Sequence, residues 1–169
     1  CIRDSYIISS GMREIIKSTS IADEFKRIYA CRYYYDETHT ATWPAQVVNY
    51  TAKTQYIFRI NKQVLDVNDD ADLNKYVPKT ERPIPFERMI YIADGLTDVP
   101  CMRLVKEYGG KSIAVYSRND AVAKSLKDVG RVNYIAKADY SSGSEMEQIV
   151  QSILDHMKAD EVLKKYEEK

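Results

Sequence analysis

The chain has 169 residues, a length that suits one domain with a sizeable hydrophobic core. Its 25 Lys and Arg residues equal its 25 Asp and Glu residues, so nothing in the charge balance points to nucleic acid or an anionic membrane. No stretch is long and apolar enough to span a bilayer. The three widely spaced cysteines, Cys1, Cys31 and Cys101, lack a metal-ligand pattern, which predicts reduced thiols in a cytoplasmic protein. We therefore predict a single domain over residues 1–169 that binds neither nucleic acid nor membranes.

The amino-terminal half predicts a strand, a β-hairpin and a helix. An apolar run at Tyr6-Ile7-Ile8 is followed by the polar turn Ser9-Ser10-Gly11 and then by a helical pattern, a succession typical of α/β proteins. In the hairpin, the tyrosine-rich strand is expected to be half-buried, and Trp43-Pro44 is expected to close the hairpin against the core. The predicted ranges are 27–36 and 40–43 for the hairpin strands, 53–61 for the helix, and 66–83 for a loop with a short helix.

The carboxyl-terminal half alternates predicted strands with predicted helices. This alternation predicts an α/β fold with a mostly parallel sheet covered by helices on both faces. Ligands of such sheets bind at the carboxyl ends of the strands, and Ser9, Asp94 and Asp98 all fall at predicted strand ends. The predicted strands are 88–93, 112–116 and 132–136, and the predicted helices are 98–108, closed by Gly109-Gly110, then 120–128 and 143–167.

Two carboxylates follow the apolar strand 88–93. Asp94 lies at the strand end and Asp98 at the start of the next helix, and Gly95 is expected to let the backbone turn sharply between them. Mg²⁺ prefers oxygen ligands and usually takes one or two protein carboxylates, with water and substrate phosphate completing its shell. The pair therefore predicts a Mg²⁺ site. The structural alternative is a turn in which the carboxylates cap the helix.

Two other features suit a phosphoryl group. Ser9, Ser10 and Gly11 place a hydroxyl and backbone amides before a predicted helix, where unpaired N–H groups and the helix dipole favour an anion. An ordinary helix cap is the alternative. Lys53 precedes a helix and could supply a positive charge, whereas a surface lysine is the alternative, and Lys62 is a nearby competitor.

The order of these features resembles the haloacid dehalogenase (HAD) superfamily of phosphohydrolases. The stretches YIISSGMREII, YTAKTQYIF and YIADGLTDVPCM resemble its second, third and fourth motifs. The hairpin between the first two stretches is similar to the one in the phosphoserine-phosphatase-like branch. The resemblance covers most of the chain, and the fourth motif is its most specific part. It implies a Rossmann-like core sheet.

The resemblance also implies residue roles. In that superfamily an Asp nucleophile attacks the substrate phosphorus, and water hydrolyses the aspartyl-phosphate that results. Ser9 would hydrogen-bond a phosphoryl oxygen, helped by the amides of Ser10 and Gly11. Lys53 would neutralise the phosphoryl group and the nucleophile.

The metal site follows from the same resemblance. Asp94 would ligate Mg²⁺ directly, and Mg²⁺ screens the charge between the nucleophile and the phosphoryl oxygens. Asp98 would hold the metal shell, either through water or by orienting Lys53.

The superfamily's first motif, an Asp-x-Asp pair after a strand upstream of Ser9, has no counterpart here. Asp4 precedes the first predicted strand, and the acidic residues of 69–72 lie in a polar loop. The resemblance therefore implies the carboxyl-terminal part of a longer protein, without the amino-terminal strand, the nucleophile or any cap domain. We expect this chain alone to be inactive. We also expect an apolar surface that binds the missing amino-terminal segment or a second copy.

The expected function is Mg²⁺-dependent hydrolysis of a small phosphorylated metabolite by the longer protein. A phosphotransferase or another hydrolase on the same scaffold is an alternative, although the Asp94 and Asp98 pair favours metal-using chemistry. A non-catalytic phosphate-binding or protein-interaction domain is an alternative from another class.

Overall fold

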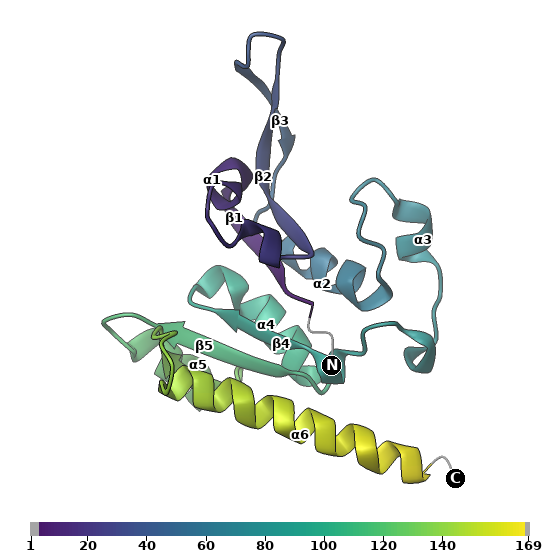
Figure 1. Ribbon diagram of the computed structural model, residues 1–169, viewed down its shortest axis with the longest axis vertical. Helices are drawn as coiled ribbons and strands as arrows, with labels where there is room; N and C mark the ends of the chain where they lie inside the picture. Colours follow the sequence, from purple (N-terminus) through teal and green to yellow (C-terminus); the bar gives the residue numbers. More distant parts are fainter. Residues whose placement is uncertain (1–3, 168–169) are drawn as a thin grey trace. The chain divides into compact units, whose positions relative to one another are not determined.

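The computed structural model describes residues 4–167 (Figure 1). Its internal contacts divide the chain into two compact units, residues 1–77 and 78–169, and each unit is described by itself. Cys31 and Cys101 carry reduced thiols, as predicted, whereas Cys1 lies outside the described residues. None of the helices within residues 4–167 is long and apolar enough to cross a membrane.

The first unit is built on a three-stranded sheet of order β1-β2-β3. β1 pairs with β2 in parallel, and β2 pairs with β3 as an antiparallel hairpin. The turn of this hairpin is held by Asp36, whose carboxylate accepts hydrogen bonds from the backbone N–H groups of Thr38 and Thr40, both at 2.9 Å. The helices and strands are β1 (Tyr6–Met12), α1 (Arg13–Lys17), β2 (Arg27–Tyr35), β3 (Ala41–Gln46), α2 (Lys53–Lys62) and α3 (Asp70–Asn74).

Helix α2 packs its apolar face into the core of the first unit. Ile57 and Ile60 of this face are buried. The rings of Tyr56 on α2 and Tyr29 on β2 stack with their centroids 4.5 Å apart. Tyr29 also donates a hydrogen bond of 3.1 Å to the backbone carbonyl of Leu65, so its polar end is satisfied inside the core.

The outer half of the hairpin differs from the prediction. Trp43 is 72% exposed and does not close the hairpin against the core, and Tyr33, Tyr34 and Tyr35 are also exposed. The physical reason lies in the strand lengths. The last pair between β1 and β2 is Met12 with Cys31, so residues 32–35 of β2 continue beyond β1 and pair only with β3. The hairpin projects in Figure 1 as a two-stranded ribbon.

The second unit contains an all-parallel sheet of order β4-β5-β6. Its strands and helices alternate as predicted, and each predicted element is present with its ends shifted by a few residues. The elements are β4 (Ile90–Ala93), α4 (Val99–Glu107), β5 (Lys111–Tyr116), α5 (Ala121–Asp128), β6 (Tyr134–Lys137) and α6 (Glu145–Glu167).

Helices cover both faces of this parallel sheet. Ala114 of β5 lies in a core cluster with Met102 of α4 and Leu126 of α5. Ile113 and Val115, its neighbours in the strand, lie in a second cluster with residues of α6. This alternation is the period-2 pattern of a strand buried on both sides. Figure 1 shows the long helix α6 running along the sheet.

Two glycines end α4 and return the chain to β5. Gly109 has φ +93°, a left-handed conformation that favours glycine, and the N–H of Gly110 donates to the carbonyl of Val105 at 2.9 Å. A Cβ atom on Gly110 would lie 2.5 Å from the backbone carbonyl oxygen of Phe86. Gly110 is therefore required by close packing, and the predicted closure of this helix is confirmed.

The chain thus belongs to the α/β class. The described strands form two small sheets, one mixed and one all-parallel, where the sequence predicted mostly parallel pairing.

Candidate functional site

The acidic motif lies at the carboxyl end of β4, at the place where ligands bind parallel sheets. Asp94 directly follows the strand, and its side chain is exposed. Asp98 lies at the end of a short 3₁₀ turn, Leu96–Asp98, that leads into α4, and it is buried. The two carboxylates therefore differ in environment although they belong to one turn.

A hydrogen-bond network holds the Asp98 carboxylate. Its Oδ1 accepts a hydrogen bond of 2.6 Å from the hydroxyl of Tyr91 on β4, and its Oδ2 accepts one of 3.3 Å from Thr97 Oγ1. Burial raises the pKa of Tyr91 well above its ordinary value, with Cys101 and the bond to Asp98 adding to the shift. The phenol therefore stays protonated and remains a donor to Asp98.

Gly95 contributes space rather than backbone freedom. Its φ of −110° and ψ of 150° are open to any residue, so the expected need for a glycine turn was wrong. A Cβ atom here would lie 3.3 Å from Thr97 Oγ1 and 3.4 Å from Asp98 Oδ2. Because both atoms belong to the network around Asp98, the glycine leaves room for that carboxylate.

A cavity of about 560 Å³ opens beside Asp94. Its lining comes from the segments that follow all three parallel strands, and includes Ser117 and Asn119 after β5 and Tyr140 after β6. Asn119 Oδ1 accepts a hydrogen bond from the N–H of Ala121, which leaves its amide hydrogens to other partners. Asp94 thus lines a partly open space large enough for a small ligand.

The predicted phosphate-binding turn has a different form. β1 continues to Met12, and Ser9, Ser10 and Gly11 bulge out of it, because only one residue of β2 lies between the partners of Ile8 and Met12. The five-residue helix α1 starts only at Arg13. The amides of Ser9, Ser10 and Gly11 therefore do not lie at its first turn, and the expectation that they would was wrong. Ser9 Oγ accepts a hydrogen bond of 3.0 Å from the N–H of Gly11, which leaves the serine proton for another acceptor.

The two candidate lysines have different surroundings. Lys53 is the first residue of α2 and is only 5% exposed, so the alternative of a surface lysine was wrong. Lys62, at the other end of the helix, donates from Nζ to the backbone carbonyls of Leu73 and Lys75, both at 2.6 Å. Lys62 therefore holds the α3 segment in place, whereas Lys53 is buried at the start of α2.

A metal site would depend on few protein ligands. Among residues 4–167 there is no group of three or more His, Cys, Asp or Glu side chains that could hold a metal ion. Mg²⁺ needs only one or two carboxylates, because water and phosphate oxygens supply the rest. The exposed Asp94 suits a direct ligand. Asp98, with both oxygens already accepting hydrogen bonds, suits orientation of water or a neighbouring cation.

The predicted site residues are divided between the two units. Ser9, Ser10, Gly11 and Lys53 belong to the first unit, and Asp94 with Asp98 belongs to the second. Tyr91 was missed in the sequence, because an aromatic residue within an apolar strand carries no signal that separates a hydrogen-bond donor from a core side chain.

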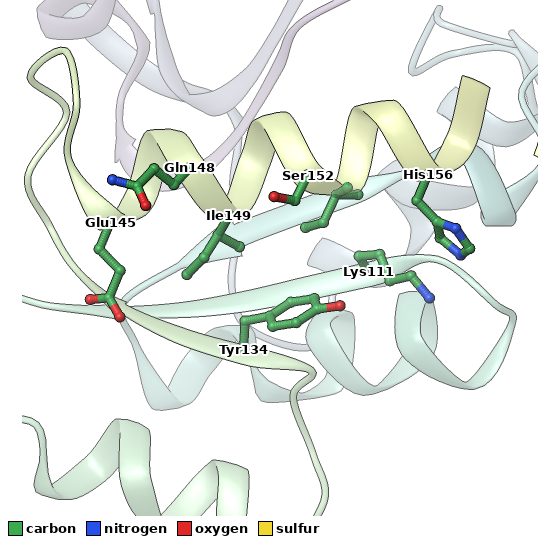
Figure 2. Close-up of a pocket in the computed structure, with 8 residues that line it drawn as sticks. Lys111, Tyr134, Glu145, Gln148, Ile149, Ser152 and His156 are labelled. Atoms are coloured by element: carbon green, nitrogen blue, oxygen red, sulfur yellow. The ribbon is translucent and has the colours of Figure 1, made fainter. Parts of the chain in front are cut away.

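A second pocket, of about 410 Å³, lies beside α6 in the second unit. Figure 2 shows Glu145 near one end, His156 and Lys111 near the other, and Tyr134 with Ile149 between them. Lys111 and Tyr134 are the first residues of β5 and β6, so this pocket lies toward the amino ends of the strands and away from the acidic motif.

Comparison with known proteins finds a relative of undescribed activity. An uncharacterized protein of Borreliella burgdorferi is 31% identical over 158 residues, which make up 83% of this chain and 54% of the relative. The chain thus spans about half the length of that relative. No family model matches the chain, and no solved structure matches it.

Proposed function

We propose that the chain forms part of a Mg²⁺-dependent phosphohydrolase of the HAD type, which hydrolyses a small phosphate monoester. The observation that carries the proposal is the acidic turn after β4. An exposed carboxylate, Asp94, stands at the end of a parallel strand beside a cavity, and a buried carboxylate, Asp98, is fixed by Tyr91 one turn later. An ordinary helix cap does not account for this pair, because Asp98 makes no side-chain cap to α4.

The proposed roles follow from the surroundings of each group. Asp94 would hold Mg²⁺ together with water and phosphoryl oxygens, and the bound ion would supply charge screening for the phosphoryl group. Asp98 would orient the ligands that surround the Mg²⁺ ion. Ser9 would donate its free proton to a phosphoryl oxygen, and the buried Lys53 would balance the negative charge. The nucleophile would be supplied by a longer protein that includes this chain.

The sheet edges give further support for a Rossmann-like HAD core. Native edge strands usually carry proline or charge that discourages further pairing. β3 has Pro44 and β6 ends in Lys137. The opposite edges, β1 with its Tyr6-Ile7-Ile8 run and the uncharged β4, have no such protection, and each pairs with one strand among the described residues. We propose that each of these edges is covered by further chain of the longer protein.

The test is an assay of phosphate release by a longer protein that includes this chain. With Mg²⁺ the protein should hydrolyse small phosphate monoesters, and EDTA should abolish the activity until Mg²⁺ is restored. The 169-residue chain alone should show no turnover under the same conditions. Turnover that survives complete removal of divalent metal would contradict the proposed chemistry.

A protein-interaction domain is the second candidate function. The specific observation in its favour is the exposed pair Tyr34 and Trp43, which face each other across the hairpin strands. Aromatic side chains of this kind are enriched in protein interfaces. This candidate would be favoured if the longer protein shows no phosphatase activity and if a Trp43→Ser variant no longer binds a partner protein that the wild type binds.

A further inference from the structure

We propose that the cavity at the carboxyl ends of β4, β5 and β6 binds an apolar organic group of the phosphate ester. This inference rests on the proposed function, which places the phosphoryl group beside Asp94. It adds a substrate class, namely alkyl or similarly apolar phosphate monoesters.

Exposed apolar side chains gather at this cavity. Leu96 is 66% exposed, and it lies two residues after Asp94 in the acidic turn. Ile92 on β4, Val122 on α5 and Tyr140 after β6 are 41%, 46% and 70% exposed, and all of them line the same space. Isolated exposed apolar residues are common on protein surfaces, whereas a group around one concave site marks a binding surface. These four side chains come from β4, the acidic turn, α5 and the segment after β6, and they share the lining beside Asp94 with polar groups such as Ser117 and Asn119.

The charges of the residues that line the cavity indicate which leaving groups it suits. Among the described residues that line the cavity, Asp94 is the one Asp, Glu, Lys, Arg or His. Ser117 and Asn119 are neutral polar groups, and the buried apolar residues Ala114, Ala123 and Leu126 also line the cavity. A leaving group with its own carboxylate would lose hydration here without gaining an opposite charge, because the lining includes no described Lys, Arg or His. An apolar leaving group would instead gain from leaving water.

The pocket beside α6 provides a contrast within the same unit. Its lining carries Lys111, Glu145 and His156, so charged groups of both signs face that space. The cavity beside Asp94 lacks this mixture and has a larger volume, about 560 Å³ against 410 Å³. Among the described residues, charged side chains of opposite sign therefore face the pocket beside α6 but not the cavity beside Asp94.

The experiment measures binding of ethyl, butyl and hexyl phosphate to the 169-residue chain by NMR, with and without Mg²⁺. These esters differ in chain length but carry the same phosphate group and primary alkoxide. In Mg²⁺ the affinity should rise about fourfold for each methylene that enters the cavity. The methyl resonances of Leu96, Val122 and Leu126 should shift with hexyl phosphate.

A matched pair of variants tests whether the alkyl chain binds in this cavity. Val122→Asn should lower the affinity for hexyl phosphate about tenfold and leave ethyl phosphate unchanged. Val129→Asn is the control, because Val129 is an exposed valine at the end of the same helix that does not line the cavity. Both variants replace an exposed side chain, so neither should disturb folding.

Separate results would overturn the two proposals. Equal affinity for all three esters, or no binding, overturns the apolar site. Affinity that rises with chain length but is the same without Mg²⁺ supports the apolar site and contradicts the metal-dependent phosphate site. If Val129→Asn lowers hexyl phosphate binding as much as Val122→Asn does, the ligand is not held in this cavity.

Discussion

At the scale of single residues, the hydrogen bond between Tyr91 and Asp98 connects the core of the second unit to the acidic turn. Asp98 is buried, and a buried carboxylate is costly unless its oxygens have partners. Tyr91 supplies one partner at 2.6 Å from within β4, next to the strand end. The strand therefore positions the turn through a side chain as well as through its backbone.

Tyr91→Phe should destabilise the chain by about 1–3 kcal/mol, because it leaves Oδ1 of a buried carboxylate without this donor. Urea unfolding, followed by circular dichroism, measures the change. Tyr134→Phe, at a partly exposed position of β6, is the control and should change stability by less than about 0.5 kcal/mol. An unchanged unfolding midpoint for Tyr91→Phe would show that this bond does not contribute.

Tyr29 predicts a pH dependence for the first unit. Burial raises its pKa to about 12, against the lowering effect of Arg27 and Arg59. The folded state then binds the phenolic proton more tightly than the unfolded state. The resulting contribution to the free energy of unfolding is therefore fully present below pH 10. It should be lost as the pH rises from about 10 to 12, at a cost of about 2–3 kcal/mol.

The measurement is urea unfolding of the wild-type chain and Tyr29→Phe at pH 9 and pH 11.5. Other groups titrate in both proteins, so the informative quantity is the difference between their pH dependences. The wild type should lose more stability than the variant. Parallel losses in the two proteins would contradict a raised pKa for Tyr29.

At the scale of elements, the sequence predicted local structure better than tertiary surroundings. The helices α2, α4 and α5 follow from apolar spacing, and Gly109-Gly110 correctly marks the end of α4. The serine-rich bulge of β1 was not predictable, because it depends on the register between β1 and β2. The exposure of Trp43 has a similar origin, since β2 is longer than the strand that covers it. Both errors concern contacts between segments distant in sequence.

Gly110→Ala should destabilise the chain by about 1–3 kcal/mol or more, because the new Cβ would lie 2.5 Å from the Phe86 carbonyl oxygen and 2.6 Å from Val105 Cγ1. Thermal and urea unfolding measure the loss. Gly143→Ala is the control, because a Cβ there meets nothing within 4 Å and only its φ of +80° opposes alanine. A smaller loss for Gly110→Ala than for Gly143→Ala would show that crowding at the end of α4 is unimportant.

At the scale of the whole molecule, the α/β class and the alternating second unit were predictable from the sequence, whereas the surroundings of the candidate site were not. The spacing of Asp94 and Asp98 identified the acidic turn, but it could not show that one carboxylate is exposed and the other is held by Tyr91. The cavity beside Asp94 could not be predicted from the sequence either, because its lining residues come from the ends of three strands. Sites of this kind depend on the sheet that assembles them.

The most direct test of the proposed function compares phosphate release by a longer protein that includes this chain with release by its Asp94→Asn and Asp128→Asn variants, in the presence of Mg²⁺. Asp128 is an exposed carboxylate at the end of α5 and does not line the cavity, so its replacement controls for the loss of one charge. We expect Asp94→Asn to lower kcat/KM by about 100-fold or more, in line with the loss of a group that holds a metal, while Asp128→Asn stays near wild type. Equal activity of the two variants would contradict the assignment of Asp94 and, with it, the proposed phosphohydrolase site.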